Sequence, residues 1–199
     1  LRQICADPRI LDPKMDEADS AKLQAFLELL EESVDANHRM LVFSTFVSAL
    51  TIIRKALEAR GIPYCYLDGS TNDRQGVCDQ FNSTPSIPVM LMSLKAGGTG
   101  LNLTAASHVV LYDRWWNPAV EDQARDRAWR IGQTRTVICH RLVCPGTVDE
   151  RVEEVVEGKR HIANLVLPKS SSLSDLSSDQ LRIALGLRAD ELLAGEDEA

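Results

Sequence analysis

The pattern of apolar and polar positions predicts helices and strands in alternation. The clearest helix begins after Asp19 or Ser20, either of which can cap it, and its apolar side chains follow the i, i+3, i+4, i+7 spacing: Leu23, Phe26, Leu27 and Leu30. Further helices are predicted from Ala49 to Arg60, from about Thr71, and from Pro118, since proline favours the first helical position. Short apolar runs predict buried strands at 40–44, 64–68, 89–93, 108–112 and 137–143.

Strands that alternate with helices are typical of a parallel sheet with helices on both faces. We therefore expect an α/β fold, with a long helix at 147–167 that braces the sheet. Such sheets bind ligands at the carboxyl ends of their strands, where the loops at Asp68, Ser93 and Asp113 lie. Residues 168–178 are rich in serine and predict a linker, and 179–199 predict a short helix followed by a disordered acidic tail.

Composition indicates one soluble unit. The 199 residues are 44 % apolar and 26 % charged, and no apolar run approaches the roughly 20 residues needed to span a membrane. Without a signal-peptide pattern, the chain is expected in the cytoplasm, near the nucleoid, of a prokaryote or in the nucleus of a eukaryote. Five cysteines without a CxxC pair indicate reduced, mostly core-filling thiols. The histidines are scattered along the sequence, so no metal site is expected: His38, His108, His140 and His161.

The net charge of −7 argues at first against a nucleic-acid partner. Residues 190–199, however, hold five acids and no base, whereas residues 113–141 hold six arginines against four acids. Contacts follow nearby charge, because salt screens distant charge beyond about 10 Å. A basic edge that contacts phosphates is therefore compatible with the overall charge.

Residues 122–133 (DQARDRAWRIGQ) carry the most informative chemistry. We predict a helix here, on which Arg127 and Arg130, three residues apart, share one face. Both guanidinium groups could then converge on one anion, such as a phosphoryl group in transfer, as arginine fingers do. The alternative is an exposed amphipathic helix on which Asp122 and Asp126 pair with the arginines.

The surrounding strings favour the first interpretation. KAGGTGLNL (95–103), WWNPA (115–119) and QARDRAWRIGQ (123–133) resemble, in this order, motifs V and VI of superfamily-two helicases, specifically of Swi/Snf-like ATPases. The resemblance implies that 21–167 form the second RecA-like lobe of a two-lobed motor and that 1–20 lead from a first lobe. No GxxxxGK[ST] loop occurs, so ATP with Mg²⁺ would be held mainly by that absent lobe, and this chain alone should not hydrolyse ATP. The string DEAD at 16–19 follows no apolar strand and is interpreted as an acidic helix start.

The resemblance also implies roles for single residues. Arg127 and Arg130 match the family's arginine fingers, and Gln123, Gly100 and Asn102 match positions near the nucleotide. Other matched positions would contact the DNA backbone with little sequence preference: Gly69, Ser70, Thr71 and Arg74 in motif IVa, Ser93, Lys95, Ala96, Gly97 and Gly98 in motif V, and Trp115.

Several of these positions have a structural alternative. Thr71 could simply cap a helix and Arg74 could lie on the surface, the glycines could form an ordinary strand-to-helix turn, and Trp115 or Trp116 could fill the core. Three residues depart from the family's usual pattern: Trp129 replaces histidine, Arg114 replaces proline and Leu94 replaces threonine.

Three functions are compatible with the sequence. The first is the second lobe of an ATP-dependent motor that tracks along double-stranded DNA, with the first lobe of the same protein and a DNA-bound protein target as partners and no membrane. The second is a nucleic-acid or protein-binding lobe whose parent has lost ATPase activity. The third, an RNA helicase lobe, fits less well, because that family has HRIGRxGR where this chain has WRIGQTRT.

Overall fold

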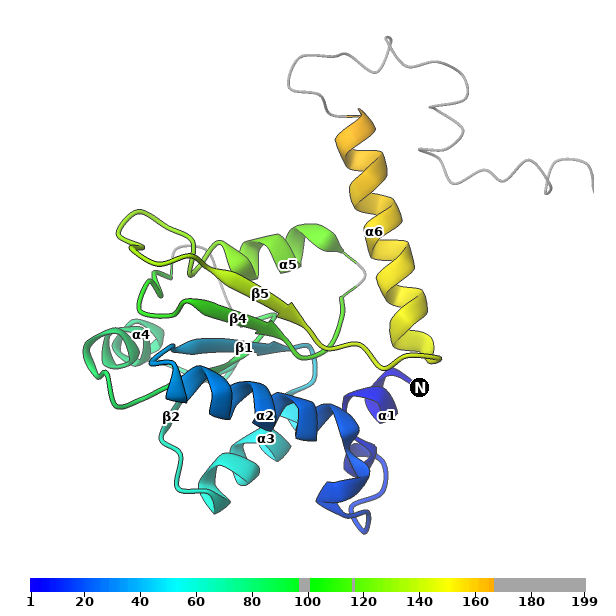
Figure 1. The fold of residues 1–199 in the computed structure, drawn as a ribbon, viewed down its shortest axis with the longest axis horizontal. Helices are drawn as coiled ribbons and strands as arrows, with labels where there is room; N and C mark the ends of the chain where they lie inside the picture. Colours follow the sequence, from blue (N-terminus) through cyan, green and yellow to red (C-terminus); the bar gives the residue numbers. More distant parts are fainter. Residues whose placement is uncertain (97–100, 116, 167–199) are drawn as a thin grey trace, which may run out of the picture. The chain divides into compact units, whose positions relative to one another are not determined.

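The computed structural model describes residues 1–96, 101–115 and 117–166 (Figure 1). The chain divides into two compact units, Leu1–Glu153 and Glu154–Ala199. The first unit contains, in chain order, α1 (Arg2–Ala6), η1 (Pro8–Ile10), η2 (Glu17–Asp19), α2 (Ala21–Asp35), β1 (Met40–Ser44), α3 (Val47–Ala59), β2 (Tyr64–Leu67), α4 (Arg74–Ser83), β3 (Val89–Ser93), β4 (His108–Leu111), α5 (Pro118–Arg125), β5 (Ile138–Arg141) and the start of α6 (Val148–Val166). None of the described helices is long and apolar enough to cross a membrane.

The five strands of the first unit form one parallel sheet in the order β2-β3-β1-β4-β5 (Figure 1). Its register places Val42 of β1 between Leu91 of β3 and Val110 of β4. The predicted α/β class is confirmed, and every predicted strand lies within two residues of its observed bounds. The predicted linker and tail at 168–199 lie outside the described residues.

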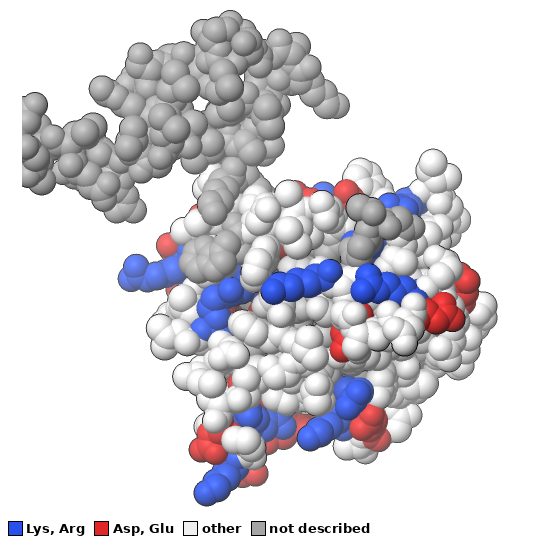
Figure 2. Space-filling view, turned by 180° about the vertical axis from the view of Figure 1, so that it is seen from behind, with Lys and Arg blue, Asp and Glu red and all other residues white. Residues whose placement is uncertain are grey.

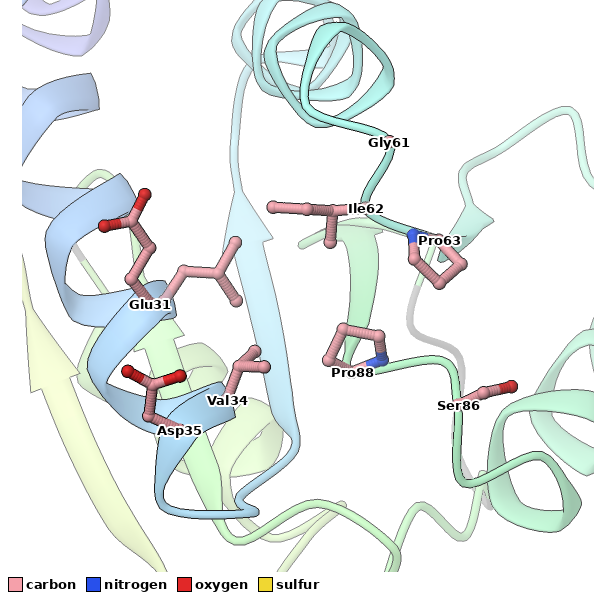
Figure 3. A pocket seen from close by; sticks show the side chains of 9 residues that line it. Glu31, Val34, Asp35, Gly61, Ile62, Pro63, Ser86 and Pro88 are labelled. Atoms are coloured by element: carbon pink, nitrogen blue, oxygen red, sulfur yellow. The ribbon is translucent and has the colours of Figure 1, made fainter.

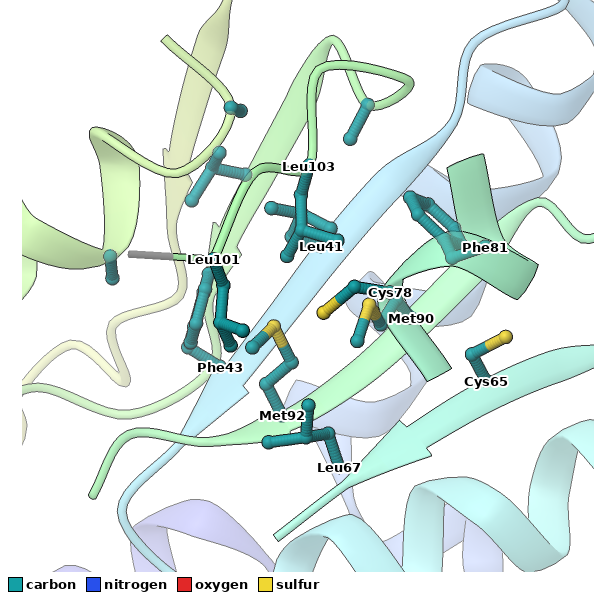
Figure 4. Close-up of a cluster of buried hydrophobic side chains, with 14 of the residues drawn as sticks. Leu41, Phe43, Cys65, Leu67, Cys78, Phe81, Met90, Met92, Leu101 and Leu103 are labelled. Atoms are coloured by element: carbon teal, nitrogen blue, oxygen red, sulfur yellow. The ribbon is translucent and has the colours of Figure 1, made fainter. Parts of the chain in front are cut away.

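Side chains alternate between the two faces of the sheet, as strand geometry requires. Met40 and Val42 of β1 join a core that α2 and α3 cover. Leu41 and Phe43 join a second core on the other face, which α4 and α5 cover and Figure 4 shows from close by. Each fully buried side chain of this size contributes about 1.5–3 kcal/mol to folding, so the two cores hold the strand ends firmly in place.

Three helix starts follow local capping chemistry. Ser20 caps α2 by accepting a hydrogen bond from the backbone N–H of Leu23 at 3.4 Å, and α5 begins at Pro118 as predicted. The prediction that the fourth helix starts near Thr71 was wrong by three residues, because Asp73 accepts from the backbone N–H of Gly76 at 2.8 Å and so caps α4 at Arg74. The DEAD string lies in the turn of η2 directly before α2, which agrees with a helix start.

The amino edge of the sheet, where the strands begin, holds a pocket of about 450 Å³ (Figure 3). Its walls are the end of α2, with Glu31, Val34 and Asp35, and the turns that precede β2 and β3, with Ile62 and Pro88. This pocket therefore lies at the edge opposite the strand ends to which the sequence assigns function.

Three of the histidines that are scattered along the sequence meet in space. The ring of His108 lies 4.7 Å from that of His38 and 4.9 Å from that of His140, centroid to centroid. Burial, followed by the nearby His140 and His38, lowers the pKa of His108 to about 4. The rings stack instead of converging on one point, and no group of side chains in the described ranges is arranged around a metal ion.

Candidate functional site

The point between β1 and β4 is where the chain's connections diverge. β1 leads to α3 on one face of the sheet, whereas its neighbour β4 leads to α5 on the other face. Open parallel sheets bind ligands in the crevice that this divergence leaves at the carboxyl ends of the strands. A cavity of about 310 Å³ lies here; we call it the strand-end pocket, and it is lined by Thr45, Leu94, Lys95, Trp115, Val120 and Gln123.

Asp113 holds the two loops of this crevice together. It follows β4, is 4 % exposed, and accepts hydrogen bonds from the Ser44 hydroxyl and from the hydroxyl and backbone N–H of Thr45. Arg2 of α1 lies 3.9 Å from the same carboxylate. Burial raises the pKa of Asp113, although the hydrogen bonds from Ser44 and Thr45 act in the opposite direction. The carboxylate is thus occupied in fixing Thr45 at the wall of the strand-end pocket.

The next residue, Arg114, is the largest fully buried side chain of the described chain. Its Nε lies 3.2 Å from a carboxylate oxygen of Glu121 in α5, and its Nη1 lies 2.9 Å from Glu153 in α6. Glu121 also accepts the backbone N–H of Trp115 at 3.2 Å, and Arg2 donates to the carbonyl of Arg114. Arg114 therefore joins α1, the β4–α5 loop, α5 and α6.

Trp115 is half-buried in the wall of the strand-end pocket. The Arg2 guanidinium lies 5.6 Å from the centroid of its ring, within the range of a cation–π contact. The neighbouring Trp116 lies outside the described residues. Because Lys95 and Gln123 line the same pocket, the structure brings together two residues predicted for DNA and one predicted for the nucleotide.

The loop after β2 is ordered by its own side chains. Asp68 accepts from the backbone N–H and the hydroxyl of Ser70 at 2.8 and 2.6 Å, and these bonds lower the pKa of Asp68. The Thr71 hydroxyl accepts from the backbone N–H of Asp68 at 3.0 Å, so it closes the loop and does not cap the helix. Gly69 and Ser70 are exposed at the tip of this loop.

Arg74 connects this loop to the loop after β3. Its Nη1 donates to the carbonyl of Ala96 at 3.1 Å. Ser93 and Ala96 are buried, at 5 % and 2 % exposed, whereas Lys95 between them is exposed. The two loops predicted to contact DNA are therefore adjacent, and the second of them exposes the charged side chain of Lys95. Gly97, Gly98 and Gly100 lie outside the described residues.

The two predicted finger arginines do not share a helix face, so this part of the prediction was wrong. α5 ends at Arg125, and residues 127–130 form turns. Arg127 is 6 % exposed, and its burial, followed by the proximity of Arg130, lowers its pKa. Arg130 is exposed and lines a second cavity of about 650 Å³, which we call the arginine pocket, together with Asn102, Trp129 and Ile131.

The turn that carries Arg130 is fixed by Gln133. Its side-chain amide donates to the carbonyls of Thr104, Ala106 and Ala128 at 3.1, 2.8 and 3.1 Å. Gly132 beside it has φ +102°, a conformation that other residues rarely adopt. The backbone N–H of Leu103 donates to the carbonyl of Arg127 at 3.1 Å, which ties the segment after residue 100 to the turn that carries the two arginines.

Sequence reasoning missed the residues that build the site. Arg114 was noted only as a departure from a pattern, and Arg2, Asp113, Glu121 and Gln133 had no assigned contact. A buried arginine and its acid partners come from distant parts of the chain, so no local spacing reveals them. The one available signal was an arginine directly after a strongly apolar strand, where a charged side chain needs a partner.

The fold is the RecA-like α/β fold of a helicase C-terminal lobe. Residues 21–132 match the helicase conserved C-terminal domain, and the chain belongs to this family. It is similar to the C-terminal domain of the Sulfolobus solfataricus SWI2/SNF2 ATPase, with a TM-score of 0.67 and 31 % identity over 92 % of this chain and 77 % of that one. The resemblance to Swi/Snf-like second lobes is thereby confirmed.

Two further likenesses extend this finding. The Sulfolobus solfataricus SWI2/SNF2 ATPase core in complex with double-stranded DNA has a TM-score of 0.69 and 34 % identity over 92 % of this chain and 40 % of that one. The putative ATP-dependent helicase/translocase YwqA of Bacillus subtilis (strain 168) is 38 % identical over 196 residues, 95 % of this chain. The chain spans 21 % of the length of that relative.

Proposed function

We propose that the chain is the second motor lobe of an ATP-dependent translocase that moves along double-stranded DNA. Arg130 carries this proposal, because it is exposed beside a cavity of about 650 Å³ while its turn is fixed by Gln133. A charged group held on a fixed turn can meet a phosphoryl group without reorganising during the reaction. ATP with Mg²⁺ is held mainly by a first lobe, which the printed sequence does not contain.

The two arginines take different parts in this proposal. Arg130 contacts the phosphates of ATP across the cleft, where a finger of this kind accelerates hydrolysis by about 10³–10⁵. Arg127 lies behind it and, being buried beside Arg130, lends positive charge while its backbone is tied to Leu103. Gln123 and Asn102 provide polar groups near the nucleotide, as the family resemblance implies.

The DNA backbone is contacted by the two joined loops. Lys95 supplies the charge, and the exposed amides and hydroxyl of Gly69 and Ser70 supply neutral donors of the kind that bind phosphate. Figure 2 shows that Lys and Arg side chains form a band across the middle of one face of the molecule, which supports an electrostatic contact. The similar Sulfolobus core in complex with double-stranded DNA also supports duplex DNA as the partner.

The proposed function includes coupling between the DNA-contacting loop and the arginines, and one backbone contact supports it. The chain leaves motif V through Asn102 and Leu103, and Leu103 is bonded to the carbonyl of Arg127 in the finger turn. A displacement of the DNA-contacting loop is thus passed to the arginines through one backbone hydrogen bond and the packing of Leu103, which is fully buried. This contact supports the proposed dependence of ATP hydrolysis on DNA.

Steady-state ATP hydrolysis by the full-length protein, with and without duplex DNA, tests the proposal. Duplex DNA should raise the rate, and Arg130→Ala should lower kcat by a hundredfold or more, equivalent to about 2.7 kcal/mol. Arg60→Ala is the matched control, because Arg60 is an exposed arginine that is not among the residues lining the strand-end pocket or the arginine pocket, and it pairs with Glu17 at 2.7 Å. Its rate should equal that of the wild type.

Lys95→Ala tests the DNA contact separately. Each phosphate neutralised by the protein adds about 0.9 to the slope of log K against log salt for duplex DNA. The variant should therefore bind duplexes of different sequence more weakly by a similar factor, with a slope reduced by about 1. An unchanged slope would remove Lys95 from the contact.

The remaining functions correspond to other outcomes of the same measurements. DNA binding without ATP turnover by the full-length protein would indicate an ATPase-dead binding lobe. Turnover that single-stranded RNA stimulates and duplex DNA does not would indicate an RNA helicase lobe. The cellular compartment and a DNA-bound protein target remain predictions from the sequence.

A further inference from the structure

The pocket of about 450 Å³ at the amino edge of the sheet, which we call the amino-edge pocket, is lined mainly by apolar side chains (Figure 3). Val34 of α2 is 42 % exposed, and Ile62 and Pro88, both half-buried, lie across the cavity from it. Exposed apolar side chains gathered around a hollow are typical of a surface that receives a side chain of a partner.

One wall of this pocket is acidic. Glu31 and Asp35 are four residues apart on α2, so they share the face of the helix beside Val34, and both are exposed. In the parts of the chain that the structure describes, neither carboxylate has an ion-pair or hydrogen-bond partner. No lysine or arginine is among the residues that line the pocket. The pocket therefore carries negative charge that its own lining does not neutralise.

The two acids also stand where they weaken their own helix. The last turn of α2, which ends at Asp35, contains no basic residue, although the C-terminal end of a helix dipole is negative and favours cations. Like charges four residues apart repel each other as well. A cation bound between Glu31 and Asp35 would relieve both effects, so this wall favours a cationic ligand over a neutral one.

Both sides of the amino-edge pocket are held by backbone hydrogen bonds. At the end of α2, the backbone N–H of Asn37 donates to the carbonyl of Val34 at 2.9 Å. At the end of α3, Gly61 has φ +64°, and the backbone N–H of Ile62 donates to the carbonyl of Leu57 at 3.0 Å. A preformed pocket loses little conformational freedom when its ligand binds.

We propose that the amino-edge pocket docks a segment of a partner protein in which an arginine or lysine stands next to an apolar side chain. The cation lies against Glu31 and Asp35, and the apolar side chain lies between Val34 and Pro88. A neutral apolar segment would cover the two carboxylates without giving them a partner, and nucleic acid would be repelled by them. The amino-edge pocket shares no lining residue with the strand-end pocket or the arginine pocket, so this inference does not depend on the proposed function.

Fluorescence anisotropy with the full-length protein tests the docking site. The probe is a short fluorescein-labelled peptide of alternating arginine and leucine. One matched peptide replaces leucine by serine, and a second replaces arginine by glutamate. The arginine–leucine peptide should bind about tenfold more tightly than the arginine–serine peptide, because it buries an apolar side chain, and the glutamate–leucine peptide should not bind.

Glu31→Lys/Asp35→Lys should weaken the arginine–leucine peptide by about tenfold or more, because two attractive charges become repulsive. Glu28→Lys/Glu32→Lys is the matched control, since Glu28 and Glu32 are exposed acids of the same helix that do not line the pocket. It should change the affinity by less than about twofold. Both variants place lysine toward the C-terminal end of α2, where cations favour the helix, so both should remain folded in thermal melts.

Val34→Ser should weaken the arginine–leucine peptide by about five- to tenfold and leave the arginine–serine peptide unchanged. Val47→Ser is its control, because Val47 is 46 % exposed on α3 and does not line the pocket. Equal weakening by the two double variants would show a general attraction to an acidic helix and would overturn the proposal. Equal affinity for the leucine and serine peptides would overturn it too. Self-association of the free protein that Val34→Ser abolishes would make the pocket an interface between two copies instead.

Discussion

Removal of the Arg114 guanidinium should destabilise the fold strongly. Arg114 is fully buried, and Glu121, its partner at 3.2 Å, is 2 % exposed. Arg114→Met fills similar space but leaves a buried carboxylate without its cation. Breaking a buried ion pair in this way costs about 3–5 kcal/mol. Because Glu121 keeps the backbone N–H of Trp115 as a donor, we expect the lower end of this range.

The other partner of Arg114 should contribute less. The Glu153 side chain is 25 % exposed and is shared with Arg141 at 3.3 Å. Water therefore compensates part of its loss, and Glu153→Ala should cost about 1 kcal/mol or less. The double variant Arg114→Met/Glu121→Met removes both buried charges, and its stability should return to within about 1 kcal/mol of the wild type, since apolar pairs replace buried ion pairs with little loss.

Urea unfolding of the 199-residue chain, followed by circular dichroism at pH 7.5, measures these differences. A shift of about 3 kcal/mol is a large fraction of the 5–15 kcal/mol of a typical domain and is easily resolved. If Arg114→Met unfolds at the wild-type midpoint, the guanidinium does not compensate the Glu121 charge. A double variant as unstable as the single one would show that the loss comes from packing instead.

Three further predictions concern pH, backbone conformation and a second buried pair. The pKa of His108 is lowered to about 4, so as the pH falls below 6.5 the unfolded chain takes up a proton before the folded chain does. The free energy of unfolding should therefore be largest above pH 6.5 and fall by about 3 kcal/mol by pH 4. His108→Gln should flatten this pH dependence when it is measured by urea unfolding. Gly132→Ala should lower stability by about 1–3 kcal/mol in thermal melts, because φ at this position is +102°. Lys22→Met should lower the free energy of unfolding in urea by about 3 kcal/mol, because the buried carboxylate of Asp149, which is 2 % exposed, loses its cation. A loss below about 1 kcal/mol, the value typical of an exposed ion pair, would contradict this.

The sheet could be predicted from the sequence because parallel strands covered on both faces read as continuous apolar runs. MLVFS and VMLMS became β1 and β3 without change. The helix starts at Ser20 and Pro118 were equally readable, since a cap or a proline acts within one turn. The start of the helix predicted near Thr71 was placed too early, because Asp73, two residues later, caps α4 instead.

The finger region could not be predicted, because tertiary contacts override its helical pattern. Arg127 and Arg130 have helical spacing, yet Gln133 draws the chain into a turn by binding carbonyls that lie 5, 27 and 29 residues away. The three histidines illustrate the same limit. They are far apart in the sequence and meet only because β1, β4 and β5 are neighbours in the sheet.

The consecutive residues Asp113 and Arg114 explain how a polar edge can also be rigid. Asp113 turns its carboxylate toward β1 and fixes Thr45, whereas Arg114 turns its guanidinium toward α5 and α6. Arg2 of α1 contacts both residues: its guanidinium lies near the carboxylate of Asp113 and donates to the backbone carbonyl of Arg114. The segment that the sequence predicts to lead from a first lobe is thus attached directly to the loops of the strand-end pocket. A change in the direction of that segment would act on Thr45 and Trp115 together, and under the proposed function this is how closing the cleft between two lobes would alter the contact with DNA.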